Sequence, residues 1–343
     1  MKMEMKLNKP LANTYGWLHV NGTLVEAVVE NTAALREELP AGVGVETKNE
    51  SPCPALKTGA GTETAALLAG VEKHVYTVAA GQKIADPLRL TLDFSAPNTG
   101  AEFCFSLADD SELTVILDYT GGVDTAAVRT TAVLGKNARL RLAQVQRLND
   151  GVTFISDLGG SVDDGGTLSL SRLVLGGEAT YDGCSIALEG TGSACAIDAG
   201  YRLGGTQKLD MNYEAVHTGK KTNCEMRVAG VLADKSFKLL RGTIDLRRGC
   251  AGAVGNEVED VLLMDETVRN QTIPVILCAE EDVVGNHGAT IGRLDEQLIY
   301  YLESRGMERD AIYEMMARAR VDAVTRRIPD PQMVQELLGE EGE

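Results

Sequence analysis

The chain has 343 residues, of which 44% are hydrophobic and 24% charged, a composition that is typical of folded globular proteins and excludes a largely disordered chain. Its formal net charge is −17, which argues against nucleic acid or an anionic membrane as a partner, because both are bound through clustered Lys and Arg. The 37 glycines beside 5 Phe and 1 Trp favour a core of small aliphatic side chains with many tight turns.

No stretch approaches the roughly 18 uninterrupted apolar residues of a membrane span, and the start, Met1–Lys6, lacks the apolar segment of a signal peptide. We therefore expect a cytoplasmic protein. The cysteines form no Cys-x-x-Cys pair, which predicts reduced thiols rather than disulfides or a zinc site. They stand at positions 53, 104, 184, 195, 224, 250 and 278.

Residues 1–74 are expected to form a small mixed α/β region. The dipeptide Asn21-Gly22 predicts a short hairpin within Trp17–Val25. Helical signals follow over Thr32–Leu39, and apolar residues at helical spacing predict a second short helix over Glu63–His74. This region is interpreted as an accessory to a larger core.

Residues 75–285 carry short apolar runs with period-two alternation, which places one side of each predicted strand inside. Glycine pairs such as Gly121-Gly122 and Gly165-Gly166 separate the runs and allow sharp turns. Without long helices between the strands, a sandwich, a barrel or a β-solenoid remains, and the length of the series favours the solenoid. The runs are Leu88–Leu92, Glu102–Leu107, Leu113–Leu117, Ala126–Val133, Ala138–Val145, Leu168–Leu175, Met226–Leu232 and Val261–Met264.

Residues 286–343 are expected to be helical. Helices are predicted over Leu294–Arg305 and Glu308–Arg326, with Gly306 ending the first, and a short third helix runs through Val334 and Leu338. Two interpretations remain open for this region, a helical hairpin that caps the fold and a surface on which a partner docks.

Catalytic motifs are largely missing from the sequence. It has no P-loop, no Gly-x-Ser-x-Gly elbow and no pair of histidines spaced for a metal on one helix. Asp163-Asp164 beside a glycine pair would suit a β-solenoid enzyme that acts on polysaccharide, but adjacent aspartates in a glycine turn usually serve the turn. We therefore expect a protein that is not an enzyme and binds no ATP itself.

His287 is the main candidate for a binding residue. It follows the last strand run and precedes the first C-terminal helix, so we expect it at the junction between them. Neutral imidazole is a nitrogen ligand of intermediate softness that suits iron. The alternative is a histidine that only satisfies backbone groups at the junction.

A segment of about forty residues around His287 carries these features in order: Pro274, Glu280-Glu281, His287-Gly288-Ala289-Thr290 and Tyr301-Leu302-x-Ser304-Arg305-Gly306. In this order and at this spacing the segment resembles the C-terminal signature of the SufB/SufD family of iron–sulfur cluster assembly scaffold proteins. The weaker pattern Gly242-x-Ile244-x-Leu246 extends the resemblance upstream.

The resemblance implies a right-handed parallel β-helix with a C-terminal helical region. It also implies a SufB-type paralogue as the pairing partner and SufC, an ABC-type ATPase, docked on residues 286–343. By position, His287 matches a histidine implicated in forming a transient cluster at the subunit interface. The implied docking residues are Leu298, Tyr301, Leu302, Arg305 and Gly306.

Departures from the SufB pattern favour a SufD-like chain. SufB-type chains are expected to have cysteine where Val268 stands and glutamate where Gly288 stands. A chain that pairs with a second copy of itself, in a minimal scaffold with SufC, stays an alternative. Cys250 and Cys278 are then weaker candidates for contact with a cluster, because free cysteine is usually a small buried hydrophobe.

Overall fold

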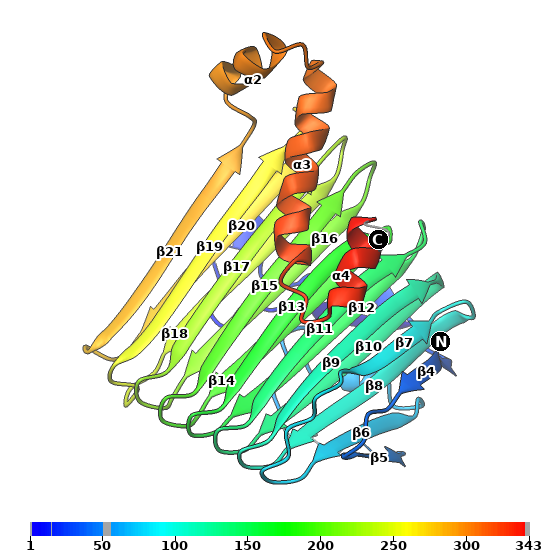
Figure 1. Ribbon diagram of the computed structural model, residues 1–343, viewed down its shortest axis with the longest axis vertical. Helices are drawn as coiled ribbons and strands as arrows, with labels where there is room; N and C mark the ends of the chain where they lie inside the picture. Colours follow the sequence, from blue (N-terminus) through cyan, green and yellow to red (C-terminus); the bar gives the residue numbers. More distant parts are fainter. Residues whose placement is uncertain (1, 15, 51–55, 340–343) are drawn as a thin grey trace.

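The computed structural model describes residues 2–14, 16–50 and 56–339. Two long sheets face each other, and consecutive strands alternate between them (Figure 1). Strands β6 to β20 with even numbers form the even sheet, and strands β7 to β21 with odd numbers form the odd sheet; within each sheet neighbouring strands are parallel. The chain therefore winds as a β-solenoid, as the length of the strand series predicts. Among the described residues, no helix is both long and apolar enough to cross a membrane.

The strands of the solenoid are mostly ten residues long. The even sheet contains β6 (Lys73–Val78), β8 (Pro97–Leu107), β10 (Val123–Leu134), β12 (Thr153–Val162), β14 (Ala179–Leu188), β16 (Lys208–His217), β18 (Phe237–Leu246) and β20 (Arg269–Cys278). The odd sheet contains β7 (Leu88–Asp93), β9 (Glu112–Gly121), β11 (Arg139–Leu148), β13 (Thr167–Gly176), β15 (Ala194–Leu203), β17 (Asn223–Leu232), β19 (Ala253–Leu263) and β21 (Val283–Gly292).

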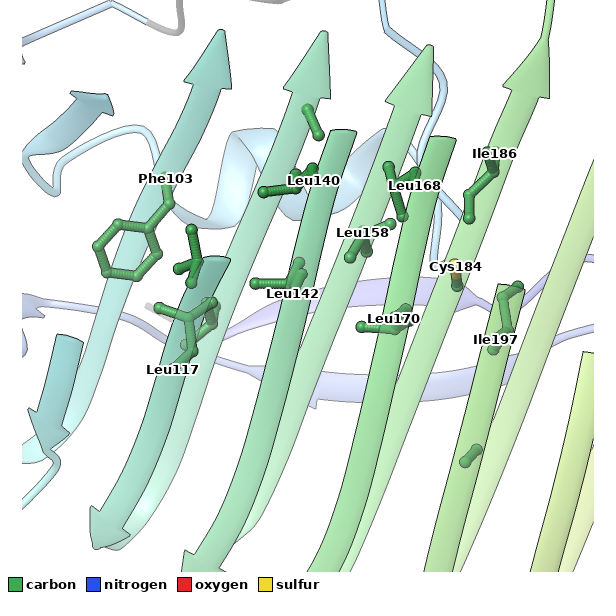
Figure 2. Packing of buried hydrophobic residues seen from close by; sticks show 14 of the residues in the cluster. Phe103, Leu117, Leu140, Leu142, Leu158, Leu168, Leu170, Cys184, Ile186 and Ile197 are labelled. Atoms are coloured by element: carbon green, nitrogen blue, oxygen red, sulfur yellow. The ribbon is translucent and has the colours of Figure 1, made fainter. Parts of the chain in front are cut away.

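The core lies between the two sheets. Inward side chains of successive coils stack in register, as Figure 2 shows for Leu142 and Leu170 of the odd sheet and Leu158 and Cys184 of the even sheet. Fully burying a Leu or Ile stabilises the fold by roughly 1.5–3 kcal/mol, so a continuous apolar column holds neighbouring coils together. The alternation that predicts the strands comes from this column.

Several strands carry no clear alternation and were not singled out by the sequence pattern, among them β12, β14 and β16. They are buried on both faces, since the burial of β16 is nearly continuous along its length. A second layer covers the outer face of the even sheet: Ala60 and Gly59 lie against Gly183, and Asn8 donates to Asp210 at 2.8 Å. Strands buried on both faces lose the period-two signal.

The N-terminal region is more extended than the sequence suggests. The predicted hairpin is wrong in its pairing: β2 (Thr23–Ala27) pairs antiparallel with β1 (Met3–Leu7), and Gly16–Leu18 form a 3-10 turn. The predicted helix over Thr32–Leu39 is also wrong. Its residues form β3 (Asn31–Thr32) and β4 (Ala34–Glu38), and β4 pairs antiparallel with β7. Hydrogen bonds to the open edge of a sheet outweigh weak local helix propensity here.

The second predicted helix is shorter than expected. It covers Glu63–Leu67 as α1, and the chain then enters β6 at Lys73. Strand β5 (Val43–Lys48) pairs antiparallel with β6, so antiparallel strands end both sheets on the N-terminal side.

The C-terminal helices lie on an outer face of the solenoid and not across its end (Figure 1). The helices are α2 (Glu296–Glu303), α3 (Arg309–Thr325) and α4 (Pro331–Leu338), close to the predicted ranges. Helix α3 contacts β13, β15 and β17 of the odd sheet. The helical hairpin of α2 and α3 therefore does not cap the last coil. The division of the chain into three regions stays a prediction. The last strand of the solenoid continues past the predicted boundary at residue 285 and ends at Gly292.

Candidate functional site

His287 lies in the middle of β21 and not at a strand–helix junction. Strand β21 is the last strand of the odd sheet and, among the described residues, pairs with β19 alone, so its other edge is open. The side chain is exposed, and His287 is in register with Glu257 on β19. The imidazole is thus carried by a strand of the solenoid, at its open end.

The inner side of the odd sheet changes character as it approaches this end. One inward row is apolar for five consecutive coils and then becomes polar at Glu257 and His287. In register order the row contains Val115, Leu142, Leu170, Ile197, Met226, Glu257 and His287. The last two coils therefore place a carboxyl group and an imidazole where the others place aliphatic side chains.

Glu257 reaches across the interior to the even sheet. Its carboxyl fills the space beside Gly242 of β18: a Cβ added at Gly242 would lie 2.1 Å from Glu257 Oε1. The side chain is 3% exposed, and its Oε2 has no hydrogen-bond partner among the described residues. Gly242 is thus needed to make room for a buried carboxyl group.

Two further charged groups lie near Glu257. The ammonium group of Lys238 forms a buried ion pair with Glu259 and donates to Thr272 Oγ1 at 2.9 Å. Burial, with the added effect of the Glu259 charge, raises the pKa of Glu257 to about 7, while Lys238 opposes the rise. Burial lowers the pKa of Lys238, and Glu259 opposes that change. The cluster holds two carboxyl groups and one amine.

The structure does not bring Cys250 or Cys278 beside His287. Gly285 of β21 faces Ile276 of β20, at 3.0 Å from an added Cβ. This pairing places His287 opposite residue 274 and Cys278 opposite residue 283, roughly 13 Å apart along the strand at 3.3 Å per residue.

The two thiols themselves lie at the turn side of the last coils. Cys250 is buried between β18 and β19, and burial raises its pKa, with smaller contributions from Glu280 and Cys278. A protonated thiol is a poor metal ligand. Cys278 is exposed, and its Sγ lies 3.2 Å from the carbonyl oxygen of Glu280. Contact of either thiol with a cluster stays a prediction, and Cys53 lies outside the described residues.

Asp163 and Asp164 stabilise a turn. Asp163 Oδ1 accepts from the backbone N–H of Asp164 at 2.7 Å, and Asp164 Oδ1 accepts from the N–H of Thr191 in the next coil at 2.7 Å. This is the ordinary role of aspartate in such turns. In the part of the chain that the structure describes, no group of three or more His, Cys, Asp or Glu side chains is placed to hold a metal ion.

Helix α2 presents an apolar surface at the end of the helical hairpin. Ile299 is buried against α3 and the ends of β17 and β19. On the outer side Leu298 is 36% exposed and Tyr301 51%, and the Arg305 guanidinium lies 5.0 Å from the centre of the Tyr301 ring. Of the other predicted docking residues, Leu302 packs partly into the same cluster, and Gly306 lies in the turn between α2 and α3 with φ +89°.

The sequence analysis missed two features of these sites. Tyr300, 74% exposed, is the most exposed large hydrophobic side chain of α2. Glu257 was missed because its importance depends on which residue lies beside it one coil later. A signal was present in Glu257-x-Glu259, two charged residues directly before the predicted run Val261–Met264 and in phase with its inward residue Val261.

Comparison with known proteins assigns a family to most of the solenoid. A family model described as SUF system FeS cluster assembly, SufBD core domain, matches residues 98–320. The chain is 23% identical over 248 residues to the iron–sulfur cluster assembly protein SufD of Bacillus subtilis, covering 67% of this chain and 54% of that protein.

The second relative is the SufD protein of Escherichia coli, 24% identical over 240 residues, or 69% of this chain and 57% of that protein. A SufBD family protein of Staphylococcus haemolyticus is 24% identical over 260 residues, or 72% of this chain and 54% of that protein. The chain thus aligns with about half the length of these curated relatives.

We predict that the Glu257 carboxyl makes stability fall as the pH rises. Its pKa is about 7 in the folded state and 4.5 in the unfolded state, so between these values the folded state holds more protons and unfolding becomes easier with rising pH. Glu257→Gln removes the effect. Relative to wild type it should gain stability between pH 5 and pH 8, by at most about 3 kcal/mol.

Urea unfolding midpoints at pH 5, 6, 7 and 8 measure this difference. Glu225→Gln, on the outer face of neighbouring β17, is the matched control and should run parallel to wild type. A constant offset between Glu257→Gln and wild type at all four pH values would contradict the prediction.

Proposed function

Since the chain belongs to the SufBD core family of the SUF iron–sulfur cluster assembly system, we propose that it is a SufD-type scaffold subunit and not itself an enzyme. In this role it pairs with a second β-solenoid, of SufB type, offers His287 to a transient cluster at the seam, and docks a SufC-type ATPase. The observation that carries the proposal is the position of His287 on the open last strand of the solenoid.

The two ends of the solenoid differ in how their edges are protected. Strands β4 and β5 end the sheets on the N-terminal side and carry charged residues such as Glu37, Glu38 and Glu46. Strand β21 has no Asp, Glu, Lys or Arg. Charges discourage strand addition at an edge, so a partner strand is better accepted beside β21.

The end of the last coil also exposes apolar groups. Ile291 is in register with buried Val261 and therefore faces inward, yet it is 39% exposed because no further coil of the described chain covers it. Strand β20 carries Pro274, whose nitrogen donates no hydrogen bond, and proline in sheets is tolerated mainly at edges. These features favour a partner that stacks on the end of the solenoid and pairs with β21 more than with β20.

A cluster held between two chains agrees with the ligand count. His287 supplies one imidazole, and the described residues contain no group of three ligands placed for a metal. The remaining ligands would come from the partner. Neutral imidazole binds iron and releases it on protonation or competition, which suits a scaffold that hands its cargo on.

Helix α2 supports the docking role. Exposed aromatic side chains concentrated on one helix are typical of protein interfaces, and Tyr300 and Tyr301 are 74% and 51% exposed. The helix is held by buried Ile299, so force applied by a partner on α2 is transmitted to α3 and the odd sheet.

Pairing through the end of the solenoid predicts that Ile291→Lys prevents dimer formation. An uncompensated buried charge costs about 3 kcal/mol or more, which weakens pairing at least about 100-fold. Val123→Lys, at a side chain that is 43% exposed on β10, is the matched control. Native mass spectrometry of the chain with and without a SufB-type protein measures pairing. Unchanged pairing of Ile291→Lys contradicts the assignment of this end, and pairing in the absence of a SufB-type protein favours a second copy as partner.

The cluster role predicts that His287→Ala lowers the iron–sulfur absorbance of the anaerobically reconstituted assembly. We expect at least about a tenfold loss, since even removal of a residue that only supports a metal ligand costs about 10- to 100-fold in affinity. Thr290→Ala changes an exposed residue of the same strand that faces the other way and should behave as wild type. Equal iron–sulfur absorbance in the His287→Ala and Thr290→Ala variants would contradict the ligand role of His287.

The docking role predicts that the double variant Tyr300→Ala/Tyr301→Ala no longer retains a SufC-type ATPase. Exposed tyrosines that become buried in an interface each contribute about 2 kcal/mol when they are hot spots, so the pair should weaken binding at least about 100-fold. Trp17→Ala, an aromatic residue that is also 74% exposed, is the control. Co-purification and calorimetry measure binding; retention of the ATPase by the double variant rules out docking on α2.

A further inference from the structure

The buried carboxyl of Glu257 has no evident structural reason. Its Oε2 lacks a hydrogen-bond partner among the described residues, and an unsatisfied buried polar group costs about 1–3 kcal/mol. The row of inward residues to which it belongs is otherwise aliphatic up to Met226. A methionine or leucine at this position would extend the apolar core, so the carboxyl group requires another explanation.

Charge balance does not supply that explanation. Lys238 is the basic group beside Glu257, and its ammonium group already pairs with Glu259 and with Thr272. Glu259 is in register with Ala289, whose side chain offers no polar group. Glu257, by contrast, is in register with His287.

The register places Glu257 and His287 next to each other on the odd sheet, and in the described part of the chain no hydrogen bond or ion pair joins the two side chains. Neighbouring strands lie about 4.8 Å apart, and residues paired in register on one face of a sheet interact directly. Both side chains are on the inward face, and Glu257 lies deeper while His287 is at the exposed end. A carboxyl group behind an imidazole is the arrangement that supports metal-binding histidines, because it accepts the N–H of the ring nitrogen that does not bind the metal.

We propose that Glu257 is a positioning residue for His287: when iron binds, the free Oε2 of its carboxyl group accepts a hydrogen bond from one ring nitrogen and so directs the other nitrogen toward iron at the open end of the solenoid. This inference rests on the proposed function of His287 as a ligand. It assigns a role to Gly242 as well, since only glycine there leaves room for the Glu257 side chain. Glu257 itself does not touch the iron.

The test is an anaerobic titration of Fe²⁺ into the full chain, alone and paired with its partner. The quantity of interest is the part of the binding that His287→Ala abolishes. Glu257→Gln keeps the size of the side chain and removes the charge, and we expect it to weaken this part about 10- to 100-fold. Glu225→Gln, on the outer face of the odd sheet, should bind as wild type.

The double variant Glu257→Gln/His287→Ala separates positioning from other roles. If Glu257 acts through His287, Glu257→Gln has no further effect once His287 is gone. An equal loss in both backgrounds overturns the inference, because Glu257 then acts independently of the imidazole. Wild-type affinity in Glu257→Gln with a loss in His287→Ala also overturns it, while the proposed function stands. If His287→Ala itself binds Fe²⁺ as wild type does, the proposed function fails first and the inference with it.

Loss of folding does not imitate the expected result. Glu257→Gln removes a buried carboxyl group that is costly to ionise, so the variant should be at least as stable as wild type at pH 8. Weaker iron binding in a chain of equal or greater stability is the outcome expected of a positioning residue.

Discussion

The register between successive coils determines which side chains meet inside this molecule. Each inward residue lies between the inward residues of the coils before and after it, as Met226 lies between Ile197 and Glu257. A slip of one residue in any strand would turn its inward side chains to the outside. The ladder of parallel hydrogen bonds and the aliphatic columns therefore set the positions of the polar residues at the end of the solenoid.

A solenoid has two ends, and each must be covered or used. Antiparallel strands cover the N-terminal end, where β4 and β5 carry charged residues. In the part of the chain that the structure describes, no further strand follows β20 and β21 at the other end, although a C-terminal helical hairpin follows directly. That hairpin lies on the outer face of the odd sheet. The open end and its polar interior thus belong to one surface, which is the surface that the proposed pairing would use.

Other segments of the chain pack on the outer faces of both sheets. On the even sheet, Asp210 accepts from Asn8 and pairs with Arg241 of the next strand, and Arg241 also donates to the carbonyl of Val20. On the odd sheet, α3 packs on β13, β15 and β17, so it ends two strands before β21. Buried charge networks of this kind are strongly weakened when one partner is removed, so Asp210 and Arg241 hold the N-terminal segment against β16 and β18.

The sequence by itself determined the class of the fold and the C-terminal helices. Period-two runs and glycine turns depend on local geometry, and so do helix ends such as Gly306, which is why these predictions agree with the structure. Local signals predicted a helix where the structure has β4, because β4 gains its hydrogen bonds from the edge of β7, far along the chain. They also failed for β16, which is covered on both faces and shows no alternation.

For the candidate site, too, the sequence and the tertiary structure each determined a different part. His287 was recognisable from its motif, but only the tertiary structure places it within an open strand. The pairing of His287 with Glu257 depends on the length of a whole coil, including its turns, and the room for Glu257 depends on Gly242 in the opposite sheet. Neither relation is local in the chain, so no pattern of neighbouring residues reveals it, and the stacking of the coils decides both.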